Sequence, residues 1–231
     1  MKKFLIILMV LCTVSSAVFA SGLSVNAGAG FDFLSGKTAK PEDNEAAKVS
    51  LPAVSVRLGG KYEFTDNLGA YLDADVLFPL MSSKVDDVTI KEMYDLFKSA
   101  DKDARCVALG VKVHAGALYK LDLENIPVEL SVGGGLVMDL HTVNLTGKPV
   151  GATKNYKESI SLLDLGVEGS IRAAYAITDK VDIGLTINPQ FMIFNMSNVS
   201  MGFDGEMETE KISGIGLGFG AQAVVSGVYH F

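Results

Sequence analysis

The last seventeen residues of the chain, 215–231, alternate between two kinds of side chain. The odd positions are apolar or small and end with Tyr229 and Phe231, whereas the even positions are mostly glycine, small or polar residues. A period of two residues is the period of a β-strand. Because the apolar face ends with aromatic residues at the end of the chain, we interpret this stretch as the closing strand of a membrane-spanning β-barrel.

Seven earlier stretches alternate in the same way, so the sequence predicts eight strands. The seven cover approximately Leu23–Phe33, Ala53–Phe64, Leu68–Leu80, Cys106–Leu121, Val128–Leu140, Leu162–Ile177 and Val181–Ile193. The connections are alternately long and short, and the long ones cover residues 34–52, 81–105, 141–158 and 194–213. Short turns that alternate with longer loops are typical of bacterial outer-membrane barrels. The predicted fold is therefore an all-β, eight-stranded, antiparallel, up-and-down transmembrane β-barrel.

The distribution of charge favours a barrel in lipid over a soluble one. No position on the apolar faces is Asp, Glu, Lys or Arg, although these residues make up 20% of the chain. A Lys or Arg that faces lipid at mid-depth destabilises a barrel by about 2–4 kcal/mol. The alternative, a soluble barrel of the lipocalin type, would bury its apolar face and carry its charges outside.

Aromatic side chains on the apolar faces gather at the ends of the strands. Six of them lie where the strands meet the short turns: Tyr62, Phe64, Tyr119, Tyr175, Tyr229 and Phe231. Aromatic residues are enriched where a barrel crosses the boundary between lipid and water. We therefore predict that these six form an interfacial girdle.

The first twenty residues have the pattern of a secretory signal peptide. Lys2 and Lys3 precede an apolar segment over 4–14, and small residues lead to a predicted cleavage after Ala20. The predicted mature chain, residues 21–231, is a single barrel domain with 18 basic and 27 acidic residues. This acidic balance argues against nucleic acid as a partner. Cys106 is the one cysteine left after cleavage, so we expect no internal disulfide.

In its strand pattern and its ending Tyr229-His230-Phe231, the chain resembles the small eight-stranded outer-membrane barrels of the OmpA, OmpX and OmpW-like group. The resemblance covers essentially the whole predicted mature chain. It implies a monomer in the lipids of the outer membrane of a Gram-negative-type bacterium, with surface-exposed loops. It also implies that the barrel-assembly machinery reads the C-terminal strand. The usual glycine five residues before the end is replaced by Ser226.

Charged residues on the opposite, inward faces are the main candidates for a functional site. Estimated depths place six of them in one mid-height layer of the lumen: Arg57, Asp73, Asp75, Lys112, Glu168 and Arg172. His114 falls in the same layer. One interpretation is a structural network of ion pairs that plugs the barrel, since buried charges need partners. The other is a gate in a narrow polar path.

The sequence offers no convincing catalytic or metal-binding pattern. Asp139 and His141 are two residues apart near an outer rim, but acyl transfer would also need a serine, and none is suitably placed. We therefore predict no catalytic residues, cofactor or metal site, and a protein that is not an enzyme.

The long connection over 81–105 contains a predicted helix. Thr89 and Glu92 form a capping-box pattern, and Ile90, Met93, Tyr94 and Phe97 share one face. This face either covers the barrel mouth or contacts a partner molecule. Other outer loops are acidic, and a weaker hypothesis is that they bind divalent cations.

The predicted function is therefore a structural or surface-interaction role, adhesin-like, that uses the outer loops. The alternative is a porin-like narrow pore or a transport route for small solutes, gated by the interior ion-pair network.

Overall fold

The computed structural model describes residues 22–37, 48–123, 127–149, 151–204 and 206–231, so the predicted signal peptide lies outside the described residues. Eight long strands form its barrel: β1 (Leu23–Lys37), β2 (Lys48–Glu63), β3 (Leu68–Pro79), β6 (Arg105–Leu121), β7 (Val128–Gly147), β8 (Tyr156–Thr178), β9 (Val181–Phe203) and β10 (Glu206–His230).

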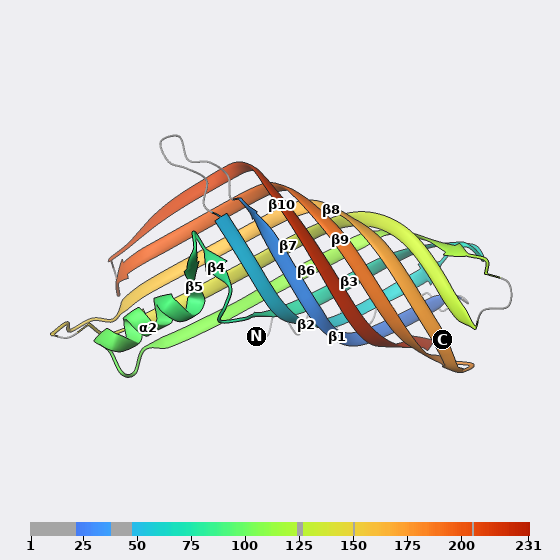
Figure 1. Cartoon of the computed structure of the whole chain (residues 1–231), viewed down its shortest axis with the longest axis horizontal. Helices are drawn as coiled ribbons and strands as arrows, with labels where there is room; N and C mark the ends of the chain where they lie inside the picture. The colour runs from blue at the N-terminus through green and yellow to red at the C-terminus, as the bar shows by residue number, and fades with distance from the viewer. Residues whose placement is uncertain (1–21, 38–47, 124–126, 150, 205) are drawn as a thin grey trace.

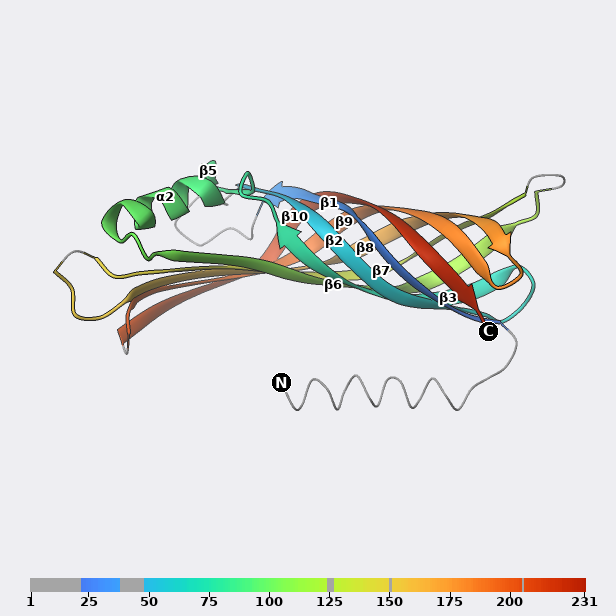
Figure 2. The same ribbon diagram turned by 90° about the horizontal axis from the view of Figure 1, so that it is seen from below.

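The strands pair in the order β1-β10-β9-β8-β7-β6-β3-β2, and β2 returns to β1. All of these pairings are antiparallel, as Figures 1 and 2 show. The closure pairs Ser24 with His230 at one end and Gly36 with Gly218 at the other. The predicted eight-stranded barrel is confirmed. We call the end that holds the short connections and Phe231 the turn end, and the opposite end the loop end.

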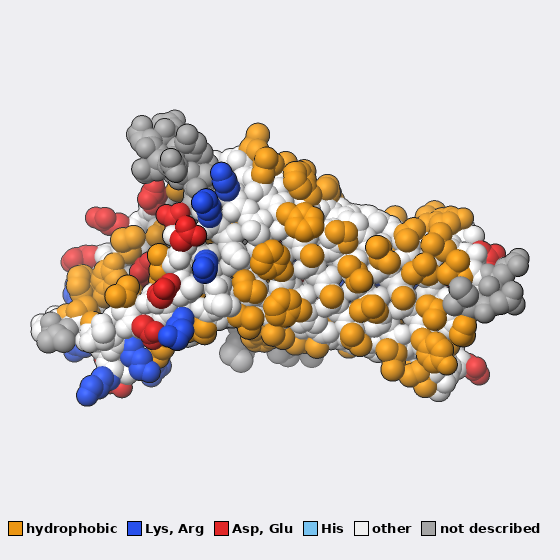
Figure 3. Space-filling model, in the orientation of Figure 1, with side chains coloured by type: hydrophobic (Ala, Val, Ile, Leu, Met, Phe, Trp, Pro, Cys, Tyr) orange, Lys and Arg blue, Asp and Glu red, His pale blue; other side chains and the backbone are white. Residues whose placement is uncertain are grey.

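The outer surface divides into an apolar belt and a charged end. In Figure 3, hydrophobic side chains cover the middle and right of the molecule, and Lys, Arg, Asp and Glu gather mainly at the left, at the loop end. Leu58, Leu72 and Leu136 are more than half exposed within the belt. Such a belt on a soluble protein would be a very large apolar patch. In lipid it is the expected outward face of a spanning barrel.

Two connections that the sequence predicted as loops, 141–158 and 194–213, are mostly strand. β7 continues to Gly147, β8 begins at Tyr156, β9 continues to Phe203 and β10 begins at Glu206. These strands leave the apolar belt and extend as hairpins at the loop end (Figure 1). The prediction of two long loops was therefore wrong.

The physical reason is that the two strand faces exchange polarity where they leave the lipid. In β7, Val143 and Leu145 are buried inside the extension, whereas Asn144 between them is exposed. In β8, Ile160 and Leu162 are buried. Outside the membrane the surroundings are water, so the extension has an apolar inner face like that of a soluble sheet. The alternation with a period of two continues past the belt. A sequence search that expects the same face to stay apolar does not detect this continuation.

The connection between β3 and β6 contains the predicted helix. A small hairpin of β4 (Lys84–Val85) and β5 (Val88–Thr89) leads into α2 (Ile90–Ala100). The capping box is present, because Thr89 Oγ1 accepts from the backbone N–H of Glu92, and the Glu92 carboxylate accepts from that of Thr89. Ile90 is buried, and the Phe97 ring lies 5.8 Å from the Tyr156 ring. Within the described part of the chain, no helix is long and apolar enough to cross a membrane.

Candidate functional site in the barrel interior

A cluster of buried charges fills the lumen at mid-height. Arg57 donates to both carboxylate oxygens of Asp75, with Nε–Oδ1 at 3.0 Å and Nη2–Oδ2 at 2.9 Å. Its Nη1 lies 3.4 Å from Asp73, which also pairs with Arg172 at 2.7 Å. Arg57, Asp73 and Asp75 are at most 2% exposed. Bidentate Arg–carboxylate pairs are the strong form of this interaction, and they fix the side chains geometrically.

His114 connects this cluster to Glu168. Its Nδ1 lies 2.6 Å from Glu168 Oε2, and its Nε2 lies 2.8 Å from Asp75 Oδ2. Tyr71 Oη donates to Glu168 at 2.7 Å. The cluster therefore holds two arginines against three carboxylates. His114 lies between two of these carboxylates, and its Nε2 is also 3.2 Å from Arg57 Nη2.

Lys112 belongs to a second cluster nearer the loop end. Its Nζ lies 2.7 Å from Asp32, 2.9 Å from Asp139 and 2.9 Å from the Gln190 side-chain oxygen. The side chains of Lys112, Asp32 and Asp139 are fully buried. His141 Nε2 lies 3.1 Å from Asp139. Loss of one member of such a buried group is destabilising, because it leaves an uncompensated buried charge.

The structure therefore differs from the single layer that the sequence predicted. Asp75 and Lys112 are direct neighbours across β3 and β6, which is why estimated depths placed them together. The long Lys112 side chain reaches instead to Asp32 on β1 and Asp139 on β7. Asp32, Gln190 and the Arg57 partner Gln222 were absent from the predicted network. Their inward parity was a signal that could have identified them.

An apolar layer lies mostly beyond the Lys112 cluster, toward the loop end. Its buried members are Leu34, Val49, Leu51, Val137, Ile160, Leu162 and Met192. Of these, Val137 precedes Asp139 on β7 and so lies on the turn-end side of the Lys112 cluster. Leu34 is the next inward position after Asp32 on β1, and Leu162 precedes Asp164 on β8 in the same way. Met93 of α2 and Val85 of β4 pack against this layer. Apolar side chains therefore fill much of the lumen toward the loop end, beside the buried polar residues His141 and Ser197.

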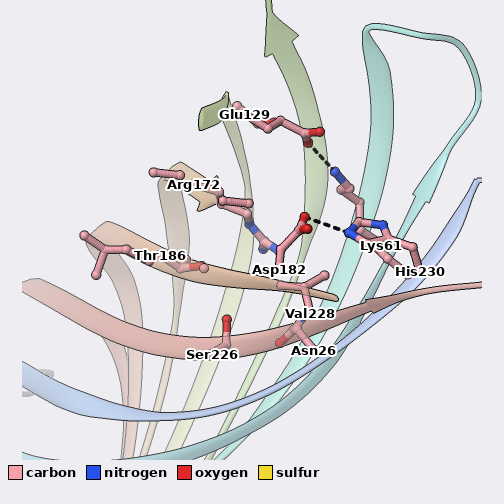
Figure 4. A pocket seen from close by; sticks show the side chains of 15 residues that line it. Asn26, Lys61, Glu129, Arg172, Asp182, Thr186, Ser226, Val228 and His230 are labelled. Carbon is pink, nitrogen blue, oxygen red and sulfur yellow. Dashed lines mark hydrogen bonds and ion pairs between the residues drawn. The ribbon is translucent and has the colours of Figure 1, made fainter. Parts of the chain in front are cut away.

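A polar cup opens at the turn end. Figure 4 shows the side chains that line it. Its cavity volume is about 50 Å³. Its wall holds the pairs Lys61–Glu129 and His230–Asp182, each at 2.7 Å. Asn26 also lines the cup and donates from Nδ2 to Asp73 at 3.2 Å, which links the cup to the Arg57 cluster. The charges of the cup are thus largely paired among themselves.

The six predicted girdle residues lie at the turn end on the outer surface. Phe64, Tyr119, Tyr175, Tyr229 and Phe231 are 40–61% exposed. Tyr62 packs edge-on against Phe64 at 5.2 Å between ring centroids, and Tyr229 against Phe231 at 5.1 Å. Ordered aromatic pairs at one level suit the boundary between lipid and water.

The Asp139–His141 pair considered for catalysis is buried among charged partners. His141 is 2% exposed and Asp139 is fully buried. Among the described residues, no group of three or more His, Cys, Asp or Glu is arranged to hold a metal ion.

No protein-family model matches the chain, and no curated protein matches it in sequence. Solved structures do match. A major outer membrane protein from Thermus thermophilus is 16% identical, with a TM-score of 0.58, and the match covers 92% of this chain and 100% of that one. Neisserial surface protein A is 15% identical, with a TM-score of 0.51 and coverage of 91% and 98%.

The chain has the fold of an outer-membrane β-barrel. It shares this fold with the small eight-stranded outer-membrane barrels that the sequence resembles. The apolar belt of such a barrel fits embedding in lipid. At 15–16% identity the likeness gives the fold and leaves the activity to be argued from the residues.

Proposed function

We propose that the protein is an integral outer-membrane barrel whose extended strands and α2 form a surface for interaction with other molecules. It acts as a monomer without catalysis, and it reaches the membrane after cleavage of a signal peptide over residues 1–20. The barrel-assembly machinery reads its C-terminal strand, which ends in Phe231. The observation that carries the proposal is the contrast between a filled lumen and strands that continue far beyond the apolar belt.

The filled lumen argues against solute flow in this state. Two buried clusters of paired charge occupy mid-height, and apolar side chains fill much of the lumen toward the loop end. Water and ions do not cross an apolar constriction readily. The cup at the turn end is then a dead end.

The extension supports a surface role. β9 and β10 reach Phe203 and Glu206, well beyond the belt, and carry exposed side chains of several kinds. Long, regular hairpins present side chains in fixed positions, as a recognition surface requires.

A narrow pore is the second candidate function, and the polar cup favours it. A path would run from the cup past Arg172 and Arg57, and then through the apolar layer, if α2 and its hairpin moved. The interior charges would then set the selectivity of this path.

Conductance of the mature chain in planar bilayers distinguishes the two functions. Heat-modifiable gel mobility reports that the barrel is folded. We expect a folded protein without discrete current steps. Discrete steps that change in size with Arg57→Ala would overturn the interaction proposal in favour of the pore. Arg57→Lys, which keeps the charge, is the matched control.

A further inference from the structure

The ring of strands closes over only part of β10. β1 pairs with β10 between Ser24–His230 and Gly36–Gly218. Between Glu206 and Leu217, β10 pairs only with β9 among the described residues. A register shift between Ile215 and Gly218 marks the place where the two regions meet. Among the described residues, the sheet is therefore open beyond the barrel, and β10 is its edge strand there.

An edge strand presents unpaired backbone N–H and C=O groups at every second residue. Ile215 and Leu217 are apolar and strongly exposed, as suits the border of the lipid belt, whereas the segment Glu206–Ser213 is mostly polar. This polar segment belongs to the hairpin of β9 and β10 at the loop end (Figure 1). An extended peptide can add to such an edge, with its main chain supplying affinity and its side chains supplying specificity.

The side chains along this edge are acidic on one face. Glu206, Glu208 and Glu210 point to the same side and are exposed. Glu206 has a loose ion pair with Lys154 at 3.6 Å, with both groups more than half exposed. Neither Glu208 nor Glu210 forms an ion pair within the described residues. The opposite face carries Thr209, whose hydroxyl bonds to that of Ser200 at 2.9 Å, and one charged residue, Lys211.

Opposite charges directly across neighbouring strands stabilise the pairing, and like charges destabilise it. An added strand that suits this edge therefore carries Lys or Arg at alternate positions, facing the three glutamates. A second copy of this chain is a poorer fit, because its own segment 206–213 would bring the same glutamates and a single lysine, Lys211.

We propose that the edge of β10 over Glu206–Ser213 binds an extended basic segment of a partner protein by strand addition, with Lys or Arg at every second residue. The proposal rests on the surface-interaction function and names the chemistry of its partner.

The probe is a fluorescein-labelled peptide of five Lys-Thr repeats, titrated with the refolded mature chain in zwitterionic micelles and followed by anisotropy. A second peptide has the same sequence but is N-methylated at alternate residues, so it keeps the charge and cannot add as a strand. We expect the first to bind, and the second to bind at least about tenfold more weakly, a difference of about 1.4 kcal/mol.

The double variant Glu208→Lys/Glu210→Lys tests the side chains. We expect it to weaken binding of the Lys-Thr peptide at least tenfold and to bind a Glu-Thr peptide instead. Asp66→Lys, an exposed residue at the turn end, is the matched control and should leave binding unchanged. Gel mobility verifies that each variant is folded.

Several results would overturn the proposal. Equal binding of both Lys-Thr peptides would mean attraction by charge alone. If the protein forms a concentration-dependent dimer that excludes the peptide, the edge pairs with a second copy of the chain. If the peptide binds only after residues 38–47 are shortened, that segment of the same chain occupies the edge. Failure of peptide binding by a folded, electrically silent barrel refutes strand addition alone, whereas current steps refute the proposed function.

Discussion

Removal of the buried cation Lys112 should destabilise the barrel far more than removal of a lysine at its rim. Lys112 Nζ lies between Asp32 at 2.7 Å and Asp139 at 2.9 Å, and all three side chains are fully buried. Lys112→Met keeps much of the side-chain volume but leaves two carboxylates without their cation. Breaking a buried ion pair in this way typically costs about 3–5 kcal/mol.

Lys120 is the matched control, because it lies on the same strand and also faces inward. It pairs with Glu129 at 2.7 Å but is 40% exposed. Exposed pairs contribute about 0–1 kcal/mol, so Lys120→Met should have little effect on stability. A third variant, Lys112→Met/Asp139→Asn/Asp32→Asn, removes the whole charged group and should recover most of the loss.

The measurement is urea unfolding in lipid vesicles, followed by circular dichroism and by gel mobility. With a slope of about 2 kcal/mol per molar urea, the expected loss lowers the midpoint by about 1.5–2.5 M. A Lys112→Met midpoint within about 0.5 M of the Lys120→Met midpoint would refute the argument. It would mean that water or a rearranged side chain neutralises the buried carboxylates.

Two further perturbations test other parts of the molecule. Val56, half exposed in the apolar belt, should lose about 2–4 kcal/mol on substitution to Arg, whereas Met207→Arg on the extension should stay within about 0.5 kcal/mol; the same urea titration compares them. Hydrogen bonds from the backbone N–H groups of Lys148 and Asp103 lower the pKa of Asp101, which joins the end of α2 to β7. Because the pKa is lowered, the stabilisation from these hydrogen bonds is present above about pH 4 and is lost as the pH falls further. The Lys148 amide should therefore lose protection from hydrogen exchange at acid pH. Unchanged protection would contradict this prediction.

The sequence predicted the lipid-embedded part of this fold well because lipid imposes one strict rule. Positions such as Leu72 and Leu185 face hydrocarbon, and no charge can replace them at low cost. The turns were equally readable: Thr65 caps its turn by accepting from the backbone N–H of Leu68. Strand order then followed from the alternation of short and long connections.

The same rule failed where the strands leave the lipid. Val143, Leu145 and Leu162 are inward and apolar, so a search for an outward apolar face ends too early. The sequence also predicted only part of the interior ion-pair network. Parity identifies which side chains point inward, but a long side chain such as Lys112 can reach partners on strands that are not its neighbours.

The lumen has its buried charge clusters at mid-height, and most of its buried apolar residues lie near the loop end. The surroundings of each strand explain this order. Within the lipid belt the outward face must be apolar, so an apolar inward face would leave both faces alike. A strand with two similar faces has a weakly specified register, because a slip by one residue then changes little. Inward charges such as Arg57 and Asp75 make that slip costly, since it would place them in lipid. Beyond the belt the outward face is polar, and Leu34 and Leu162 can then be apolar inside without loss of register.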